Sequence, residues 1–250
     1  MNFIYKFLFI LIFTFAINMP SNAETKSPKS IYSSEADPKV IEIIKKLKGK
    51  KELIRTAKLE SKVLYNLPFR RKLKLVQDIS IEKESEIHIR IFAIWKIKIA
   101  EFFTKDGQII YQRLGKKDKI RNIETFNLKI FNKHLDLPLT TLELNNFLLG
   151  MNIDTFDNNG YKYDLKNNKL IIFNKNNKCI VDLKTNEIEK ILVDDHRKME
   201  INYSRYTQIK EHKIKLPLYV ELKTDTFTMQ INIQNDIIIN NKNLNEKKPL

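Results

Sequence analysis

Alternation of apolar and polar residues dominates this sequence. In residues 57–63, 87–91 and 96–99, Ala, Leu, Val and Ile mostly alternate with Lys, Glu, His and Arg. The same period of two returns at residues 216–222 and 227–233. Successive side chains of a β-strand point to opposite faces, so each of these segments predicts a strand with one buried face.

Short polar segments separate the predicted strands. Lys105-Asp106-Gly107-Gln108 has the composition of a hairpin turn, and Thr224-Asp225 separates the last two strands. Asn replaces the scarce Gly in the other expected turns, at residues 158–160, 166–168, 175–177 and 184–186. Because Asn tolerates the left-handed backbone conformation of tight turns, we expect the strands to follow one another as an antiparallel meander.

A helix is expected near the beginning of this pattern. Asp37 and Pro38 suit its N-cap and first position, and Gly49 suits its end. Lysines gather between residues 45 and 51, where positive charge favours the helix dipole. The expected apolar side contains Val40, Ile41, Ile44 and Leu47.

Residues 120–149 interrupt the strands with two further helical patches. In the second patch, Thr140 or Thr141 can cap the helix and Gly150 can end it. The sequence thus predicts a mainly β (α+β) fold, a strongly curved antiparallel sheet that forms an incomplete barrel covered by a few helices. We expect one domain at residues 37–240, with a flexible leader at 24–36 and a polar tail at 241–250.

The first 23 residues have the order of a secretory signal peptide. A basic start is followed by an apolar core at residues 7–17 and by small residues that end at Ala23. This core is shorter than the roughly 20 residues of a membrane-spanning helix. We expect cleavage after Ala23 and export to the periplasm, where the protein is soluble or peripheral to the outer membrane; the alternative is an uncleaved anchor.

Charge and candidate chemistry narrow the classes of function. The formal net charge of +15 suggests an anionic partner, although the abundant Lys, Asn and Ile are typical of an AT-rich genome. An exported protein rarely meets nucleic acid, so none is expected. The glycines and histidines have no phosphate-loop or metal-ligand spacing, and Asp194-Asp195-His196 is better explained as a hairpin turn. We therefore expect no enzyme activity, cofactor or metal, and Cys179 as a small buried residue.

Some segments resemble the LolA and LolB family of lipoprotein carriers and receptors, and most closely its uncharacterised LolB-like members. The resemblance rests on a helix ending in Leu148-Leu149-Gly150, on Tyr203-Ser204-Arg205-Tyr206 followed by Leu216-Pro217-Leu218, and on Ile237-Ile238-Ile239-Asn240. It implies that the protein carries or accepts an acylated lipoprotein or another lipid between the inner and outer membranes, as a monomer that holds acyl chains. The cavity candidates are Ile89, Ile91, Ile97, Ile99, Leu218, Val220, Met229 and Ile231.

The resemblance also implies a membrane-contact turn at Ile94, Trp95 and Lys96. An aromatic residue beside a cation suits a lipid interface, but the family's usual Pro or Gly is absent, and a continuous strand with Trp95 in the core is the alternative. The receptor's anchoring Cys is absent as well. Two other functions stay open: an envelope scaffold that binds anionic membrane or polymer through its basic surface, and a hydrolase, for which the sequence shows no convergent polar site.

Overall fold

The structure of the protein is a computed structural model that describes part of the chain. The described residues are 29–30, 36–66, 72–82, 86–93, 97–105, 108–113, 116–120, 126–127, 138–139, 141–151, 161–195, 198–209, 212 and 214–240. The predicted signal peptide, its cleavage site and the polar tail lie outside them, so these remain predictions.

Most of the described residues belong to β-strands. The elements, in chain order, are β1 (Lys29–Ser30), α2 (Pro38–Leu53), β2 (Thr56–Asn66), β3 (Leu73–Glu82), β4 (Glu86–Phe92), β5 (Lys98–Lys105), β6 (Gln108–Arg113), β7 (Lys116–Ile120), β8 (Phe126–Asn127), β9 (Pro138–Leu139), α3 (Thr141–Leu148), β10 (Lys162–Lys166), β11 (Lys169–Phe173), β12 (Asn177–Asp182), β13 (Glu187–Val193), β14 (Met199–Ile209), β15 (Ile214–Lys223), β16 (Thr228–Ile233) and β17 (Ile238–Ile239).

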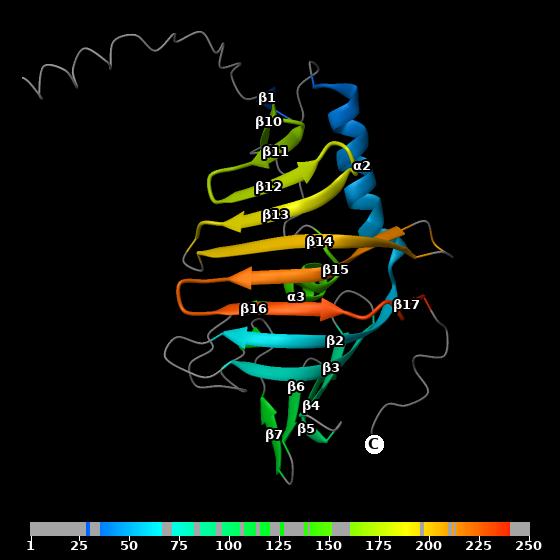
Figure 1. Ribbon diagram of the computed structural model, residues 1–250, viewed down its shortest axis with the longest axis vertical. Coiled ribbons are helices and arrows are strands. Elements are labelled where there is room, and N and C mark those ends of the chain that lie inside the picture. Colours follow the sequence, from blue (N-terminus) through cyan, green and yellow to red (C-terminus); the bar gives the residue numbers. More distant parts are fainter. Residues whose placement is uncertain are drawn as a thin grey trace, which may run out of the picture.

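One large antiparallel sheet contains all of these strands except β8 and β9 (Figure 1). Strands β2 to β7 form a first meander, and β10 to β16 form a second meander. The two meanders join where β16 pairs with β2, so that Ile231 lies opposite Val63. The sheet does not close, because β1 and β7 lie at its two edges. The predicted fold class, an unclosed antiparallel sheet with a few helices, is confirmed.

The alternation in the sequence gives the sheet two different faces. In β2, Ala57, Leu59 and Val63 are buried, whereas Lys58 and Lys62 are exposed. We call the face with the buried residues, which α2 and α3 cover, the inner face, and the opposite one the outer face. Figure 1 shows α3 behind β15 and β16, and α2 running past the ends of β10 to β13. The inner face therefore forms the core of the protein.

The asparagine turns are confirmed where the structure describes them. Asn167, Asn168 and Asn186 have φ angles of 50°, 58° and 57°, in the left-handed region. The turn before Asn177 works differently, because the side chain of Asn174 accepts backbone hydrogen bonds from Asn176 and Asn177. Local side-chain chemistry thus sets the hairpins of the second meander.

Helix α2 begins as predicted but ends later. The Asp37 side chain accepts a hydrogen bond from the Lys39 backbone at 2.8 Å, and Pro38 is the first helical residue. The helix continues through Gly49 to Leu53, so the predicted end at Gly49 is wrong. The buried positions are Val40, Ile43, Ile44, Leu47 and Lys50, while Ile41 is 36% exposed. Lys50, which directly follows Gly49, is buried. This tertiary packing outweighs the tendency of a glycine to end a helix.

The insert between the meanders contains one helix among the described residues. Helix α3 ends as predicted at Gly150, whose φ is +62°. The backbone N–H groups of Gly150 and Met151 donate to Phe147 and Asn146, the pattern of a Schellman cap. Most of residues 121–137, where the other helical patch was expected, lie outside the described part. Neither α2 nor α3, the two described helices, is long and apolar enough to cross a membrane.

Two strands of the large sheet occur where the sequence predicted none, and the short pair β8 and β9 lies within the stretch where only helical patches were expected. Strand β7 pairs with β6 at Lys116–Ile120, a segment with too little alternation to predict it. Lys29 and Ser30, within the expected leader, pair with Lys162 and Tyr163 of β10. Backbone hydrogen bonding at the two edges of the sheet, rather than hydrophobic patterning, accounts for both additions.

Candidate functional site

The inner face is mainly apolar and combines residues of both meanders. Five of the cavity candidates are at most 5% exposed on it: Ile89, Ile91, Val220, Met229 and Ile231. Val220 lies opposite Ile231, and Ile231 lies opposite Val63 across the junction of the meanders. These side chains belong to the hydrophobic core cluster, and a role for them in holding a lipid stays a prediction.

The other three cavity candidates occupy different surroundings. Ile99 is partly buried and packs against the core. Leu218 also packs there, but it lines a pocket of about 410 Å³ together with the exposed Lys62. Ile97 is 56% exposed, so it does not share the buried surface. It lies outside the regular pairing because it precedes β5 and closes the turn after β4.

Three polar side chains lie among the apolar ones on the inner face. Ser61 is fully buried, and within the described part its hydroxyl has no hydrogen-bond partner. Gln77, opposite Ser61 in the register, donates to the Tyr65 hydroxyl at 3.5 Å. Burial raises the pKa of Tyr65 to about 12. Ser61 and Gln77 are polar residues at positions that the alternation assigns to the buried face of their strands. This signal in the sequence was not recognised.

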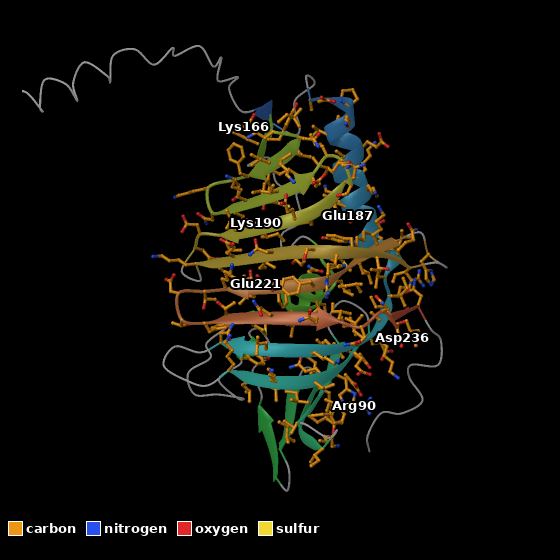
Figure 2. All side chains as sticks on the ribbon, in the orientation of Figure 1. Arg90, Lys166, Glu187, Lys190, Glu221 and Asp236 are labelled. Carbon is orange, nitrogen blue, oxygen red and sulfur yellow. The ribbon has the colours of Figure 1, made fainter. Side chains whose placement is uncertain are left out.

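A buried ion pair connects α2 with the second meander. Lys50 Nζ lies 3.5 Å from Glu187 Oε2, and the two side chains are 8% and 5% exposed. Lys50 also lies 5.4 Å from the centre of the Tyr206 ring, a cation–π contact. Burial lowers the pKa of Lys50 to about 8, although the charge of Glu187 opposes the shift. Figure 2 shows Glu187 near α2.

The end of α3 packs closely against the same part of the sheet. A Cβ on Gly150 would lie 2.8 Å from Pro217 and 3.4 Å from the Tyr206 hydroxyl, so no side chain fits there. That hydroxyl donates to the Ile188 carbonyl at 2.5 Å. Phe147 is fully buried. Tyr206 thus contacts Lys50 of α2 and lies close to Gly150, where the chain leaves α3.

Cys179 lies in the core of the second meander, as predicted. It is 4% exposed in β12, and burial raises the pKa of its thiol to about 12. Burial also raises the pKa of Tyr203 well above its usual value. Because a thiolate is the reactive form of cysteine, this environment makes Cys179 unreactive in the folded protein.

Strands β4 and β5, which lie on either side of the predicted membrane-contact residues, pair with each other in antiparallel fashion. Phe92 pairs with Lys98, and the Ala93 N–H donates to the Ile97 carbonyl at 2.9 Å. The chain therefore reverses between these strands, which excludes the continuous strand that we considered as an alternative. Ile94, Trp95 and Lys96 themselves lie outside the described residues.

The outer face contains a second buried carboxylate, Glu101. Its Oε1 lies 2.6 Å from His88 Nε2, and its Oε2 accepts a hydrogen bond from Lys98 at 2.7 Å. Burial alone would raise the pKa of Glu101, but the hydrogen bonds and charges of Lys98 and His88 outweigh it and hold this pKa below its usual range. Such an arrangement stabilises a carboxylate rather than preparing it to take up a proton.

The remaining candidate chemistry is structural. Asp194 and Asp195 lie in the turn between β13 and β14, as the hairpin interpretation predicted, and the Asp194 N–H donates to the Asn176 carbonyl at 2.7 Å. Within the described residues, no group of three or more His, Cys, Asp or Glu side chains could hold a metal ion.

Comparison with known proteins identifies the fold but not the family. No family model and no curated protein matches the chain. Among solved structures, the chain is similar to a protein from Vibrio parahaemolyticus described as an outer membrane lipoprotein-sorting protein domain, at a TM-score of 0.53 and 11% identity over 82% of this chain and 94% of the other. A DUF1329 family protein from Desulfovibrio piger gives the same score and identity over 80% and 93%.

These likenesses agree with the observed topology. A LolA superfamily protein from Nitrosomonas europaea covers 79% of this chain and 94% of its own at 7% identity, but its TM-score of 0.49 is too low to add support. The chain has a LolA/LolB-like fold, as the sequence resemblance predicted. At such low identity the likeness extends to the fold alone.

Proposed function

We propose that this protein is a periplasmic carrier or acceptor of lipoproteins or other lipids, which holds acyl chains against the inner face without catalysis. The main observation that supports this proposal is the broad apolar inner face of an unclosed sheet. Three different strands contribute Ile89, Val220 and Ile231 to this face. Burial of each CH₂ group of an acyl chain contributes about 0.8 kcal/mol, so binding needs no reactive group. The Ser61 hydroxyl, which has no hydrogen-bond partner among the described residues, offers one polar contact to an ester or amide of the cargo.

The turn between β4 and β5 is the proposed point of membrane contact, through Ile94, Trp95 and Lys96. Exposed residues around it support this role: Ile97 is 56% exposed, and Leu73, at the start of the neighbouring strand β3, is 44% exposed. Lys72, Lys74 and Lys98 are exposed as well. Apolar side chains surrounded by lysines suit an anionic lipid surface.

Native mass spectrometry of residues 24–250, purified from a periplasm without detergent, tests the carrier function. We expect additional mass that resolves into phospholipid or acylated peptide. A bare mass, together with failure to take up an added apolar dye, would refute lipid holding. It would favour the scaffold alternative, which the net charge of +15 supports and which predicts binding that weakens with salt.

Vesicle co-sedimentation tests the membrane-contact turn separately. Trp95→Glu is expected to lower association with anionic vesicles at least tenfold while the circular dichroism spectrum stays unchanged. Thr185→Glu, an exposed change in a turn of the second meander, alters the net charge by the same single unit and is the matched control for added negative charge. Equal association of both variants with the vesicles would contradict the assignment.

A further inference from the structure

The outer face contains a pocket that the proposed carrier function does not use. It has a volume of about 410 Å³ and is lined by Lys62, Arg205, Leu218, Asn232, Ile233, Gln234 and Asn235. This lining, which comes from β2, β14, β15, β16 and the segment after β16, includes two cations, three amide side chains and no acid. A lining of this composition provides hydrogen-bond donors and positive charge without a built-in anion.

Arg205 is held in an unusual backbone conformation at this pocket. Its φ is +54°, a left-handed value that costs free energy for a residue with a side chain. By strand alternation, Arg205 would point toward the inner face as Ile201 and Tyr203 do. Instead it is exposed on the outer face, where its guanidinium lies 5.8 Å from the centre of the Tyr219 ring.

The guanidinium of Arg205 is fixed by neutral groups. Nη2 donates to the Leu218 carbonyl at 3.2 Å and to Asn232 Oδ1 at 3.0 Å. Both contacts use Nη2, so within the described part of the chain Nε and Nη1 are left without acceptors. No described carboxylate lies within ion-pair distance of Arg205. The nearby Glu221 is instead bound by Lys223 at 2.8 Å and by Gln230 at 2.9 Å.

The strand register brings a second cation to the same place. Asn232, which holds Arg205, lies opposite Lys62 of β2. Lys62 likewise has no ion-pair partner among the described residues. Arg205 from the second meander and Lys62 from the first meander therefore lie on opposite sides of one amide side chain, and the pocket spans the junction of the meanders.

We propose that this pocket binds a phosphate-class oxyanion between Arg205 and Lys62. A planar guanidinium with free donors matches two phosphate oxygens, and a lysine adds a point charge. The Asn and Gln amides can supply further donors, and the carbonyl of Leu218 helps to hold Arg205 in place. The anion is the phosphate of a lipid headgroup or of a soluble phosphate ester. Acyl binding on the inner face is not required for this site.

Titration followed by ¹H–¹⁵N NMR, with inorganic phosphate and then glycerol 3-phosphate, tests the site. We expect saturable shifts confined to Arg205, Asn232, Gln234 and Asn235. Lys62→Gln and Arg205→Gly are each expected to weaken binding at least tenfold. Lys58→Gln, an exposed lysine on the same strand and face, is the matched control and is expected to leave binding unchanged.

Arg205→Gly separates binding from folding. Glycine adopts the left-handed conformation without strain, so this variant is expected to keep the melting temperature of the wild type or raise it. Shifts that do not saturate, that spread over surface lysines, or that persist in both pocket variants would overturn the proposal. Dihexanoyl-phosphatidylglycerol below its micellar concentration then distinguishes the sources. Tenfold tighter binding than glycerol 3-phosphate identifies a lipid headgroup, and equal binding identifies a soluble ester.

Discussion

Two buried glutamates, Glu187 and Glu101, are stabilised by cations that differ in their burial and in their distance along the sequence. Both side chains are almost fully buried, at 5% and 6% exposure. Glu187 pairs on the inner face with Lys50, which is buried as well and comes from α2, far away in the sequence. Glu101 pairs on the outer face with His88 and Lys98 of its own hairpin, which are 26% and 49% exposed.

The difference shows that burial of a carboxylate does not by itself determine how much the fold is destabilised when its partner is lost. A cation that is partly in water can turn to solvent when its partner is lost, whereas a buried cation cannot. Loss of the inner pair therefore leaves an uncompensated charge beneath α2. Loss of the outer contacts affects one hairpin, because His88, Lys98 and Glu101 all belong to β4 and β5.

Removal of one partner of the inner pair has the largest expected effect. Lys50→Met should lower the free energy of unfolding by about 3 kcal/mol, because Glu187 stays buried without its nearest cation. The double variant Lys50→Met/Glu187→Leu should recover most of that loss, since apolar residues of similar size can replace a buried pair. Urea unfolding followed by circular dichroism measures both.

Lys46→Met provides the control for this measurement. Lys46 Nζ lies 4.0 Å from the other Glu187 oxygen but is 55% exposed, so its removal should cost less than about 0.5 kcal/mol. If Lys46→Met and Lys50→Met cost the same, burial of the cation does not determine the strength of the pair.

Removal of the outer carboxylate should have a smaller and more local effect. Glu101→Gln is expected to cost about 1 kcal/mol, because His88 and Lys98 can be hydrated in its absence. Hydrogen exchange should speed up in β4 and β5 and stay unchanged in β12 to β14. Faster exchange throughout the sheet would contradict the local role assigned to Glu101.

The pH dependence should separate the two glutamate sites by the direction of their effects. The pKa of Lys50 falls to about 8 in the folded state, so the unfolded chain binds more protons above that pH. Relative to Lys50→Met, the wild type should gain stability between pH 8 and about 10.4. The pKa of Glu101 is lowered, so its contribution is present above the unfolded value of about 4.3 and is lost as the pH falls below it.

Unfolding of the wild type, Lys50→Met and Glu101→Gln at matched pH values measures both effects. The difference between the wild type and Lys50→Met should change only in the alkaline range, and the difference for Glu101→Gln only in the acid range. A flat alkaline difference would mean that Lys50 keeps its proton in the folded protein.

The sequence predicted features that arise from neighbouring residues. Alternation predicted the one-sided burial of β2, Asn167 and Asn168 predicted a left-handed turn, and Gly150 predicted the end of α3. Each depends on a conformational preference that acts within a few residues. The helix end at Gly49 was wrong because packing of the following turn outweighs the preference of one glycine.

The candidate site could be predicted only in part, because its key contacts join distant segments. Ile89, Val220 and Ile231 were expected on the inner face from alternation alone. Lys50, by contrast, was noted only as one of the lysines that favour the helix dipole, and nothing local indicates that Glu187 would reach it. The orientation of Arg205 toward the outer face could not be predicted either, since nothing in the sequence indicates that an arginine within a strand has a positive φ.

The pairing of β2 with β16 and β17 has a consequence for the order of synthesis. Strand β2 is made early, but β16 and β17, which pair along one of its edges, are made last. Asn240 then bonds to Leu53, Arg55 and Thr56, where α2 meets β2. The sheet therefore cannot be completed before the second meander and β17 have been made, and long-range pairing of this kind is slow. The nascent chain therefore stays without its final fold until these late strands are available, the state in which a polypeptide can still be threaded through a narrow pore.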